Sequence, residues 1–252
     1  MEMQYAARTH IGLVRQLNED SYAVEAGLRP YGVAVVADGM GGHLAGEVAS
    51  SLAIETVLTQ LKNSSFEAET NDVSDLLVDA MQVANRIVHE RASTSSGLSG
   101  MGTTLVVALF DEREFYLGHI GDSRAYLFQQ GELVQLTDDH TLVNELFKNG
   151  QLTEEEASAH PQRNIVTRAV GTDETVQADL HHRTWAEGDI LLICSDGLTN
   201  MVQSDVLSDI LSGSDQLEAK VDALIDRALA AGGHDNITAV ALHNLSERGE
   251  AR

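Results

Sequence analysis

The sequence contains one cysteine, Cys194, in a chain of 252 residues. A single cysteine cannot form a disulfide within the chain, so a disulfide framework is excluded and a reducing cytoplasm is the expected compartment. Because Cys194 lies within an apolar stretch, we expect it to be buried and to have only a packing role. Long apolar runs are also missing: none approaches the roughly 18 residues of a membrane span, and no basic segment followed by an apolar run begins the chain. Neither secretion nor membrane insertion is expected.

Basic residues are scarce as well. The chain has 16 Lys and Arg residues against 39 Asp and Glu residues, for a formal net charge of −23. Such a charge argues against nucleic acid or an anionic membrane surface as a partner. Aromatic residues make up 4% of a sequence that is 43% hydrophobic, which predicts an aliphatic core. With no repeat, low-complexity segment or linker, residues 1–252 are expected to form one domain and a monomer.

One acidic turn dominates the sequence. The small and β-branched residues 33–37 indicate a strand buried on both faces, which delivers Asp38 into a glycine-rich turn. That carboxylate cannot belong to a core. Gly39 and the glycines that follow have no side chains to screen their backbone, so an ion or ligand could approach it closely beside Asp38.

The same arrangement recurs along the chain. Strand-like segments lead to Asp122 and Asp196, and a further acidic turn containing Asp235 precedes the last strand-like segment. Any one of these could be a simple turn, because Asp-Gly is a common turn dipeptide. Their recurrence favours one oxygen-rich site where the strands converge. Such a site suits the hard divalent cations Mg²⁺ and Mn²⁺.

The order of elements predicts an α+β fold. Apolar stripes at helical spacing indicate helices over 45–61, 72–91, 204–211 and 217–231. Closely spaced strands are expected over 103–110, 115–121, 124–128 and 133–136, in an antiparallel meander. Two helices, a run of strands and two more helices thus follow one another along the chain. This order indicates helix pairs that cover a sheet or sheets, and it leaves the order of the strands open.

Residues 138–171 interrupt the strands with a polar, helix-forming segment. Within it, Thr153 and Glu156 have the spacing of a helix capping box. Long polar insertions between strands are more often functional than filler, so we interpret this segment as a flap near the active site, with a passive cover as the alternative.

Six motifs in order carry a family resemblance. They are Asn18-Glu19-Asp20, Ala37-Asp38-Gly39-Met40-Gly41-Gly42-His43, Met101-Gly102-Thr103-Thr104, Gly121-Asp122-Ser123-Arg124, Cys194-Ser195-Asp196-Gly197 and Gly233-His234-Asp235-Asn236-Ile237-Thr238. Together they resemble the signature series of the metal-dependent serine/threonine protein phosphatases of type 2C (the PPM family). Met40 and His43 match the bacterial branch, whereas animal relatives carry histidine directly after the Asp-Gly pair.

The resemblance implies a central β-sandwich flanked by helix pairs, a four-layer α-β-β-α fold, with a binuclear Mn²⁺ or Mg²⁺ centre. Asp38 would bridge two metals, the Gly39 carbonyl would bind one of them, and Asp196 and Asp235 would complete the other. Asp20 would hold a metal-bound water or lie at the margin of the second ion. Asp122, together with Asp196, matches a third metal position.

The implied reaction is hydrolysis of phosphoserine and phosphothreonine in proteins by a metal-activated water, as part of cytoplasmic signalling. Two cations can lower the pKa of a water and clamp the phosphoryl oxygens, which also explains how an acidic chain could bind a phosphate dianion. Asp38, Asp196 and Asp235 are the expected catalytic residues. Arg15 matches the arginine that grips phosphate, and His43 is a possible proton donor, although water on a metal would suffice.

Two other functions stay open on the sequence. A catalytically silent phosphatase-like module could bind metal or sense phosphorylated partners, although the full ligand set counts against it. A two-metal phosphodiesterase is disfavoured because the acidic surface repels polynucleotides. If the chain is an enzyme of this kind, its partners are phosphorylated proteins, commonly the substrates of a serine/threonine kinase.

Overall fold

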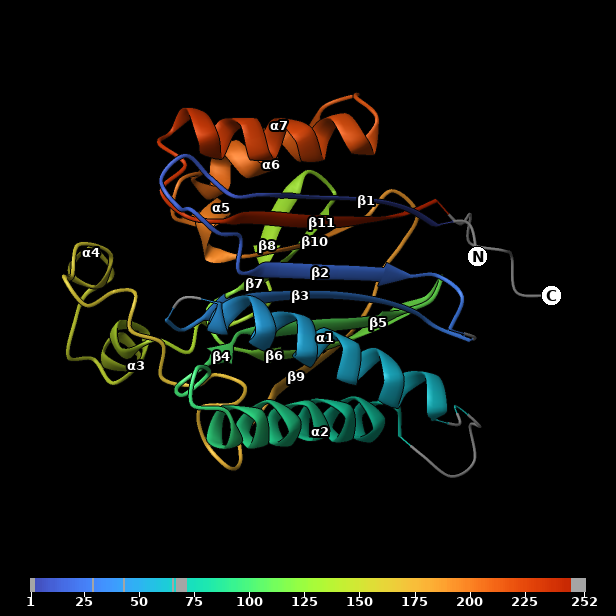
Figure 1. Ribbon diagram of the computed structural model, residues 1–252. Coiled ribbons are helices and arrows are strands. Elements are labelled where there is room, and N and C mark those ends of the chain that lie inside the picture. The colour runs from blue at the N-terminus through green and yellow to red at the C-terminus, as the bar shows by residue number, and fades with distance from the viewer. Residues whose placement is uncertain (1–2, 29, 43, 65, 67–71, 246–252) are drawn as a thin grey trace.

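The protein is a sandwich of two antiparallel β-sheets, covered on each outer face by helices. The computed structural model describes residues 3–28, 30–42, 44–64, 66 and 72–245. Figure 1 shows the layers in order: α6 and α7, the first sheet, the second sheet, then α1 and α2. The expected α-β-β-α arrangement is confirmed.

Strands from distant parts of the sequence alternate within each sheet, and all the pairs are antiparallel. The first sheet has the order β1-β11-β10-β7-β8 and the second β2-β3-β5-β6-β9, with β4 added beside β3. The strands are β1 Met3–His10, β2 Asp20–Glu25, β3 Gly32–Met40, β4 Gly102–Thr103, β5 Leu105–Phe110, β6 Glu114–Ile120, β7 Arg124–Gln129, β8 Glu132–Gln135, β9 Asp179–Thr184, β10 Ile190–Cys194 and β11 Ile237–Asn244.

Three of the four expected helices are the long helices that cover the sheets. The helices of the described residues are α1 Ala45–Asn63, α2 Val73–Thr94, α3 Leu142–Lys148, α4 Glu154–Ser158, α5 Asp196–Thr199, α6 Ser204–Ser212 and α7 Leu217–Ala230. The stripe predicted for 72–91 lies against the second sheet, and the stripe predicted for 217–231 lies against the first. None of these helices combines the length and apolar character needed to cross a bilayer.

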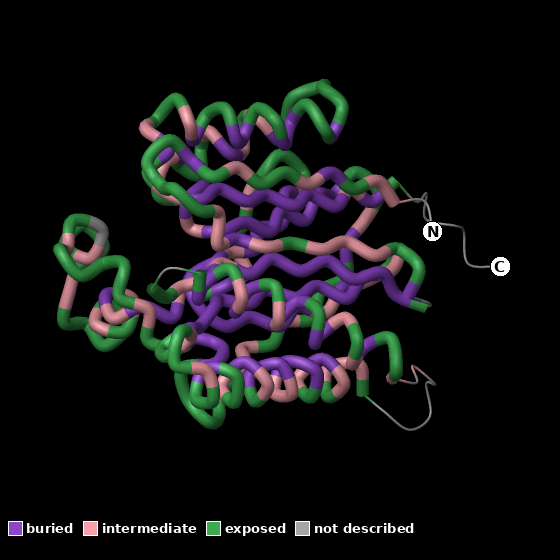
Figure 2. Tube along the Cα trace, in the orientation of Figure 1, coloured by how far each residue is buried: buried purple, intermediate pink, exposed green. Residues whose placement is uncertain are grey.

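Alternation along β3 explains its uninterrupted apolar sequence. Val33, Val35 and Ala37 pack in the cluster shared with α1 and α2. Ala34 and Val36 point the other way, into the core between the two sheets. Both faces of the strand are therefore dry, as the sequence predicted. Figure 2 shows the buried trace concentrated in the sheets and on the inward sides of the helices.

The core between the sheets ends in a small aromatic cluster. Phe115 on β6 meets Trp185 edge to face, with ring centroids 5.4 Å apart. Trp185 also donates a hydrogen bond from its indole nitrogen to the Asp111 carbonyl oxygen at 2.9 Å. Cys194 is a buried free thiol at the end of β10, in agreement with its expected packing role.

Two local predictions were incomplete. Strand β9 was missed because its sequence, DLHHRT, has no apolar alternation, and three of its last four residues are exposed. Asp38 lies inside β3, which continues to Met40 because β4 pairs with Gly39 and Met40. The glycine-rich turn therefore begins later than the sequence predicted.

Candidate active site

A cavity of about 310 Å³ brings the acidic motifs together at one end of the sandwich. Its wall contains Arg15, Glu19, Asp38, Gly39, Met40, Gly41, Thr104, Asp122, Asn164, Val166, Asp196, Asp235 and Asn236. Each expected carboxylate of this set lies inside a strand or beside a strand end: Asp38 near the end of β3, Asp122 after β6, Asp196 after β10 and Asp235 before β11. His43, the possible proton donor, lies outside the described residues.

Asp38 is held in place through its backbone. Its N–H donates to the Thr104 hydroxyl at 2.9 Å, and its carbonyl oxygen accepts from the Thr104 N–H and the Thr103 hydroxyl, both also at 2.9 Å. Thr103 and Thr104 are themselves buried. These hydrogen bonds satisfy the backbone polar groups of Asp38 and hold its backbone in place.

Gly39 is required by a close approach of the chain to α1. A Cβ at this position would lie 2.1 Å from the carbonyl oxygen of Gly46 and 2.6 Å from that of Glu19. The Gly39 N–H donates to the Glu19 carbonyl oxygen at 3.1 Å, and the Glu19 carboxylate accepts from the Gly46 N–H at 3.2 Å. The motifs around Glu19 and Gly39 are thus clamped to the beginning of α1.

Asp20 lies next to Asp38 on the neighbouring strand and is not among the residues that line the cavity. The register of β2 and β3 places the two residues directly opposite each other. One carboxylate oxygen, Oδ2, accepts from the hydroxyls of Ser195 and Thr238, each at 2.7 Å. The other oxygen, Oδ1, is buried and has no hydrogen-bond partner among the described residues. An unpartnered buried carboxylate oxygen is suited to a water or a cation.

Asp196 and Asp235 also line the cavity. Asp196 begins α5, and its Oδ2 accepts from the Asn200 side-chain amide at 2.9 Å. Asp235 Oδ2 accepts from Arg15 Nη2 at 2.7 Å, which holds the guanidinium at the cavity. Burial would lower the pKa of Arg15, but the charge of Asp235 and this hydrogen bond outweigh it and raise the pKa. Arg15 therefore stays cationic beside the acids.

Asn236 fastens the segment that carries Arg15. Its side-chain amide donates to the carbonyl oxygens of Ile11 and Leu17, both at 2.9 Å. Its side-chain oxygen accepts from the Glu19 N–H at 2.8 Å. Asn236 belongs to the last acidic motif, but its bridging role could not be predicted, because nothing in the spacing shows that it contacts residues more than 200 positions away.

Electrostatic crowding is the main property of the cavity. Burial, followed by the charges of neighbouring aspartates such as Asp20 and Asp196, raises the pKa of Asp38 well above its ordinary value. Burial and the charge of Asp196 raise the pKa of Asp122 to about 8. Burial raises the pKa of Asp20 to about 6, against the opposing effect of its two hydroxyl donors. Nearby positive charge would lower these pKa values, because it favours the ionised form of each carboxylate.

The donor set fits hard divalent cations. The wall offers carboxylate and carbonyl oxygens, the ligand types that Mg²⁺ and Mn²⁺ prefer. Among the described residues, no three of these carboxylates have oxygens within 4.8 Å of one another. The buried, unpartnered oxygen of Asp20 and the raised pKa values of the aspartates fit the same conclusion, because a bound cation would satisfy the oxygen and offset the crowded negative charge.

The flap contributes to the wall as well. Asn164 and Val166 line the cavity, and a neighbouring pocket of about 490 Å³ between the flap and the sandwich shares Asp122, Asn164 and Asp196 with it. Sequence analysis predicted a flap over 138–171 but none of its cavity residues. The predicted capping box is present: Thr153 Oγ1 accepts from the Glu156 N–H at 3.2 Å, and the Glu156 carboxylate accepts from the Thr153 N–H at 2.8 Å.

The raised pKa values predict how the metal-free protein responds to pH. In the folded state the pKa values of Asp20 and Asp122 exceed the ordinary value of about 3.9, so the stability they contribute is complete below that pH and is lost as the pH rises through about 6 and about 8. We expect the melting temperature of the chelator-treated protein to fall as the pH rises from about 5 to about 8.5.

The matched variants are Asp122→Asn and Asp209→Asn, which remove the same charge from a buried and an exposed position. Thermal melts should show the decline above pH 7 flattened in Asp122→Asn and kept in Asp209→Asn. Equal slopes in the two variants would contradict the assignment of this decline to Asp122.

Comparison with known proteins agrees with this geometry. The chain is 39% identical over 243 residues to the serine/threonine phosphatase stp of Listeria welshimeri, covering 96% of each chain. The S. agalactiae serine/threonine phosphatase structure superposes with a TM-score of 0.90 at 36% identity, over 96% of this chain and 99% of the other. The catalytic domain of the serine/threonine protein phosphatase PstP, a structure with two manganese ions, gives a TM-score of 0.83 at 37% identity, over 96% and 97% of the two chains.

The model of one protein family matches most of the sequence. It is described as protein phosphatase 2C and matches residues 9–232, a range that includes Arg15 and all the acidic motifs up to Gly232. Relatives of similar length and solved structures agree in both sequence and architecture. The chain belongs to the protein phosphatase 2C family.

Proposed function

We propose that this chain is a metal-dependent protein serine/threonine phosphatase that hydrolyses phosphoserine and phosphothreonine in proteins. The observation that carries the proposal is the placement of four separate aspartates and one arginine, Arg15, on a single cavity. The names of its relatives, which are serine/threonine phosphatases, support the same reaction.

The aspartates would hold the cofactor. We propose that Asp38 and the Gly39 carbonyl serve one Mn²⁺ or Mg²⁺ ion, that Asp38, Asp196 and Asp235 serve a second, and that Asp20 lies at the margin. Asp122 and Asp196 would take a third ion. When bound, the cations supply positive charge for the phosphoryl group and lower the pKa of the attacking water. The two manganese ions of the PstP structure support the metal dependence.

The chain's own groups bind and orient the substrate. The Arg15 side chain is 50% exposed, and its bond to Asp235 keeps the guanidinium fork at the cavity. A fork of this kind can donate two parallel hydrogen bonds to phosphate oxygens. Asp38 is fixed by Thr103 and Thr104, so its carboxylate can act without a change of backbone. Asn236 keeps the Arg15 segment against the acidic wall.

The physiological setting follows from the same proposal. Substrates would be phosphoproteins made by a serine/threonine kinase. The single buried thiol of Cys194 is compatible with the reducing cytoplasm. A formal net charge of −23 disfavours self-association, which supports a monomer. The rival function, a catalytically silent metal-binding or phosphoprotein-sensing module, is tested by Mn²⁺-dependent hydrolysis of a chromogenic aryl phosphate, which only the enzyme performs.

Asp38→Asn and Asp235→Asn should each lower phosphatase turnover by at least about a hundredfold, because loss of a direct ligand should exceed the 10- to 100-fold cost of losing an outer partner. Steady-state kinetics with an aryl phosphate and saturating Mn²⁺ measure the effect. Circular dichroism and melting curves should show intact folds, and Asp209→Asn serves as the charge-matched surface control. Near-normal turnover in either variant would overturn the proposed metal centre.

Arg15→Ala should raise KM for an aryl phosphate by about 10- to 100-fold, with a smaller change in kcat. The reason is that hydrogen bonds to charged groups contribute about 1.5 to 3 kcal/mol. Arg15→Lys keeps the positive charge but loses the forked guanidinium, so its KM should lie between that of the parent and that of Arg15→Ala. Unchanged kinetics in Arg15→Ala would return Arg15 to the role of a surface ion pair.

The flap should govern the choice of protein substrate more than the chemistry. Phe147 on α3 is 43% exposed and lines the pocket between the flap and the sandwich. Phe147→Ala should therefore lower kcat/KM for a phosphoprotein about tenfold while leaving that for an aryl phosphate unchanged. The control is Val134→Ala on β8, an apolar side chain of similar exposure (46%) outside the cavity and the pocket. Equal kinetics of Phe147→Ala and the parent on both substrates would favour a passive cover.

A further inference from the structure

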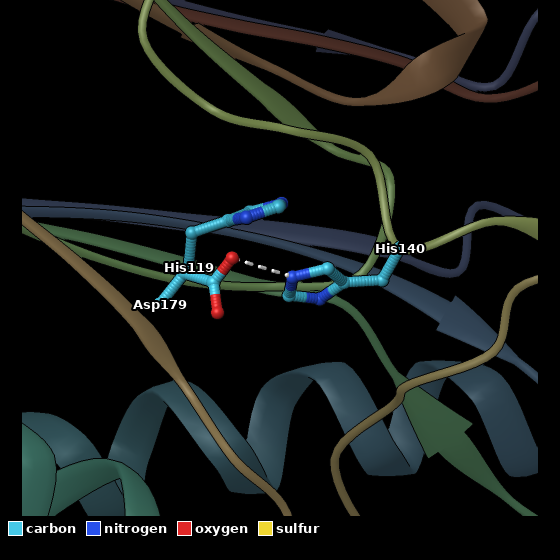
Figure 3. Close-up of side chains that lie close together, drawn as sticks. All are labelled: His119, His140 and Asp179. Carbon is cyan, nitrogen blue, oxygen red and sulfur yellow. Dashed lines mark hydrogen bonds and ion pairs between the residues drawn. The ribbon is translucent and has the colours of Figure 1, made fainter. Parts of the chain in front are cut away.

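A compact polar cluster lies beside the acidic cavity, at the base of the flap. Figure 3 shows its members, His119 from β6, His140 from the start of the flap and Asp179 from β9. One ligand atom from each lies within 4.8 Å of the others. The cluster was not predicted, because its members come from three segments with no common spacing and from a strand, β9, that the sequence does not reveal.

The hydrogen bonds of His140 determine its tautomer. Its Nδ1 accepts from the backbone N–H of Gly121 at 3.0 Å, and a backbone N–H can only donate. The proton of the neutral ring is therefore on Nε2, which donates to Asp179 Oδ2 at 3.1 Å. Burial, together with the nearby charge of Arg168, lowers the pKa of His140, which keeps the ring neutral as this arrangement requires.

The Arg168 guanidinium lies against two members of the cluster, His140 and Asp179. Arg168 Nη1 lies 3.1 Å from Asp179 Oδ1 and 3.3 Å from His140 Nε2. With Nδ1 engaged by Gly121 and Nε2 protonated, His140 has no free lone pair for a metal. The cluster is therefore an arrangement of hydrogen bonds in which the Asp179 carboxylate accepts from both His140 and Arg168.

His140 connects this cluster to the turn that carries Asp122. Besides the side-chain bond, the His140 N–H donates to the Gly121 carbonyl oxygen at 2.8 Å, so the residue before Asp122 is held on both backbone groups. Gly121 has a φ of +108°, and a Cβ there would lie 2.6 Å from the Cβ of Thr104. The turn is thus pressed between His140 and the threonine that holds Asp38.

His140 also contacts the C-terminal end of the flap. The Thr167 N–H donates to the His140 carbonyl oxygen at 2.8 Å, and Thr141 forms a β-bridge with Val166. The ring of His119 packs beside that of His140, with centroids 4.6 Å apart, which limits rotation of the His140 ring. The imidazole of His140 therefore contacts the Asp122 turn and β9, and its backbone carbonyl holds the end of the flap.

We propose that His140, oriented by Asp179, is a positioning residue that fixes the Gly121–Asp122 turn for cation binding and joins it to the flap. This inference rests on the proposed function, because it concerns the third cation assigned there to Asp122 and Asp196. Outer partners that orient a ligand typically change metal affinity by about 10- to 100-fold when they are removed.

The experiment compares Mn²⁺ binding by variants of the whole chain. His140→Leu removes both ring hydrogen bonds, whereas His140→Asn keeps an acceptor for the Gly121 N–H and loses the link to Asp179. His182→Asn is the matched control, since His182, like His140, pairs with a carboxylate, that of Glu114, at 2.8 Å, and lies on the same strand as Asp179. Bound Mn²⁺ per chain is measured by electron paramagnetic resonance of the free ion, independently of activity, with Asp122→Asn as the reference.

We expect His140→Leu to weaken the lowest-affinity class of Mn²⁺ sites at least about tenfold, and so to resemble Asp122→Asn. His140→Asn should be affected less, and His182→Asn should bind as the parent does. If His140→Leu fails to fold, the comparison between His140→Asn and His182→Asn decides. Parental Mn²⁺ binding in a folded His140 variant would overturn the inference, whereas absence of Mn²⁺-dependent phosphatase activity in the parent would overturn the proposed function instead.

Discussion

The mutual repulsion of buried carboxylates is the constraint on which the rest of this structure depends. Asp20, Asp38, Asp122 and Asp196 all have raised pKa values, with burial as the first cause and neighbouring aspartates as a further one. A fold that gathers such groups without positive charge is destabilised at neutral pH. The gathering is explained if cations belong to the folded state, because bound cations reverse the local sign of the charge and let a chain of strongly negative net charge accept a phosphate.

The sandwich supplies the rigidity that this crowding demands. Antiparallel pairing of β2 with β3 sets Asp20 opposite Asp38, and hydroxyl groups from neighbouring segments hydrogen-bond to the Asp38 N–H and to one carboxylate oxygen of Asp20. Asn236 joins the segment bearing Arg15 to the start of β11. Few of these supporting groups need to touch substrate. They hold the aspartates in position at the end of the sandwich, whereas the hydrophobic cores lie between the sheets and under the helices. The residues of the site and the residues of the core are therefore different.

The long helices, the central strand and the acidic residues of the site could be predicted from the sequence, for identifiable reasons. One face of α2 packs on the second sheet, so its apolar residues recur at helical spacing. Both faces of β3 are covered, so its apolar residues are continuous. The acidic motifs occur in a recognisable order. The strand β9 was out of reach because its ladder with β6 is formed by polar residues such as His182, without alternation. Contacts such as Asn236 with Ile11, or His140 with Gly121, depend on tertiary pairing and leave no periodic signal. The extension of β3 beyond Asp38 to Met40 depends on the two-residue strand β4, which propensity could not identify.

The central claim is that the acidic cavity, and not the neighbouring histidine cluster, binds the divalent cations. Anomalous X-ray diffraction from crystals of the protein equilibrated with Mn²⁺, recorded above and below the manganese absorption edge, tests it directly. The account predicts anomalous peaks in the cavity, in contact with carboxylate oxygens of Asp38, Asp196 and Asp235. Peaks confined to His119, His140 and Asp179, or no peak within the cavity at saturating Mn²⁺, would contradict it.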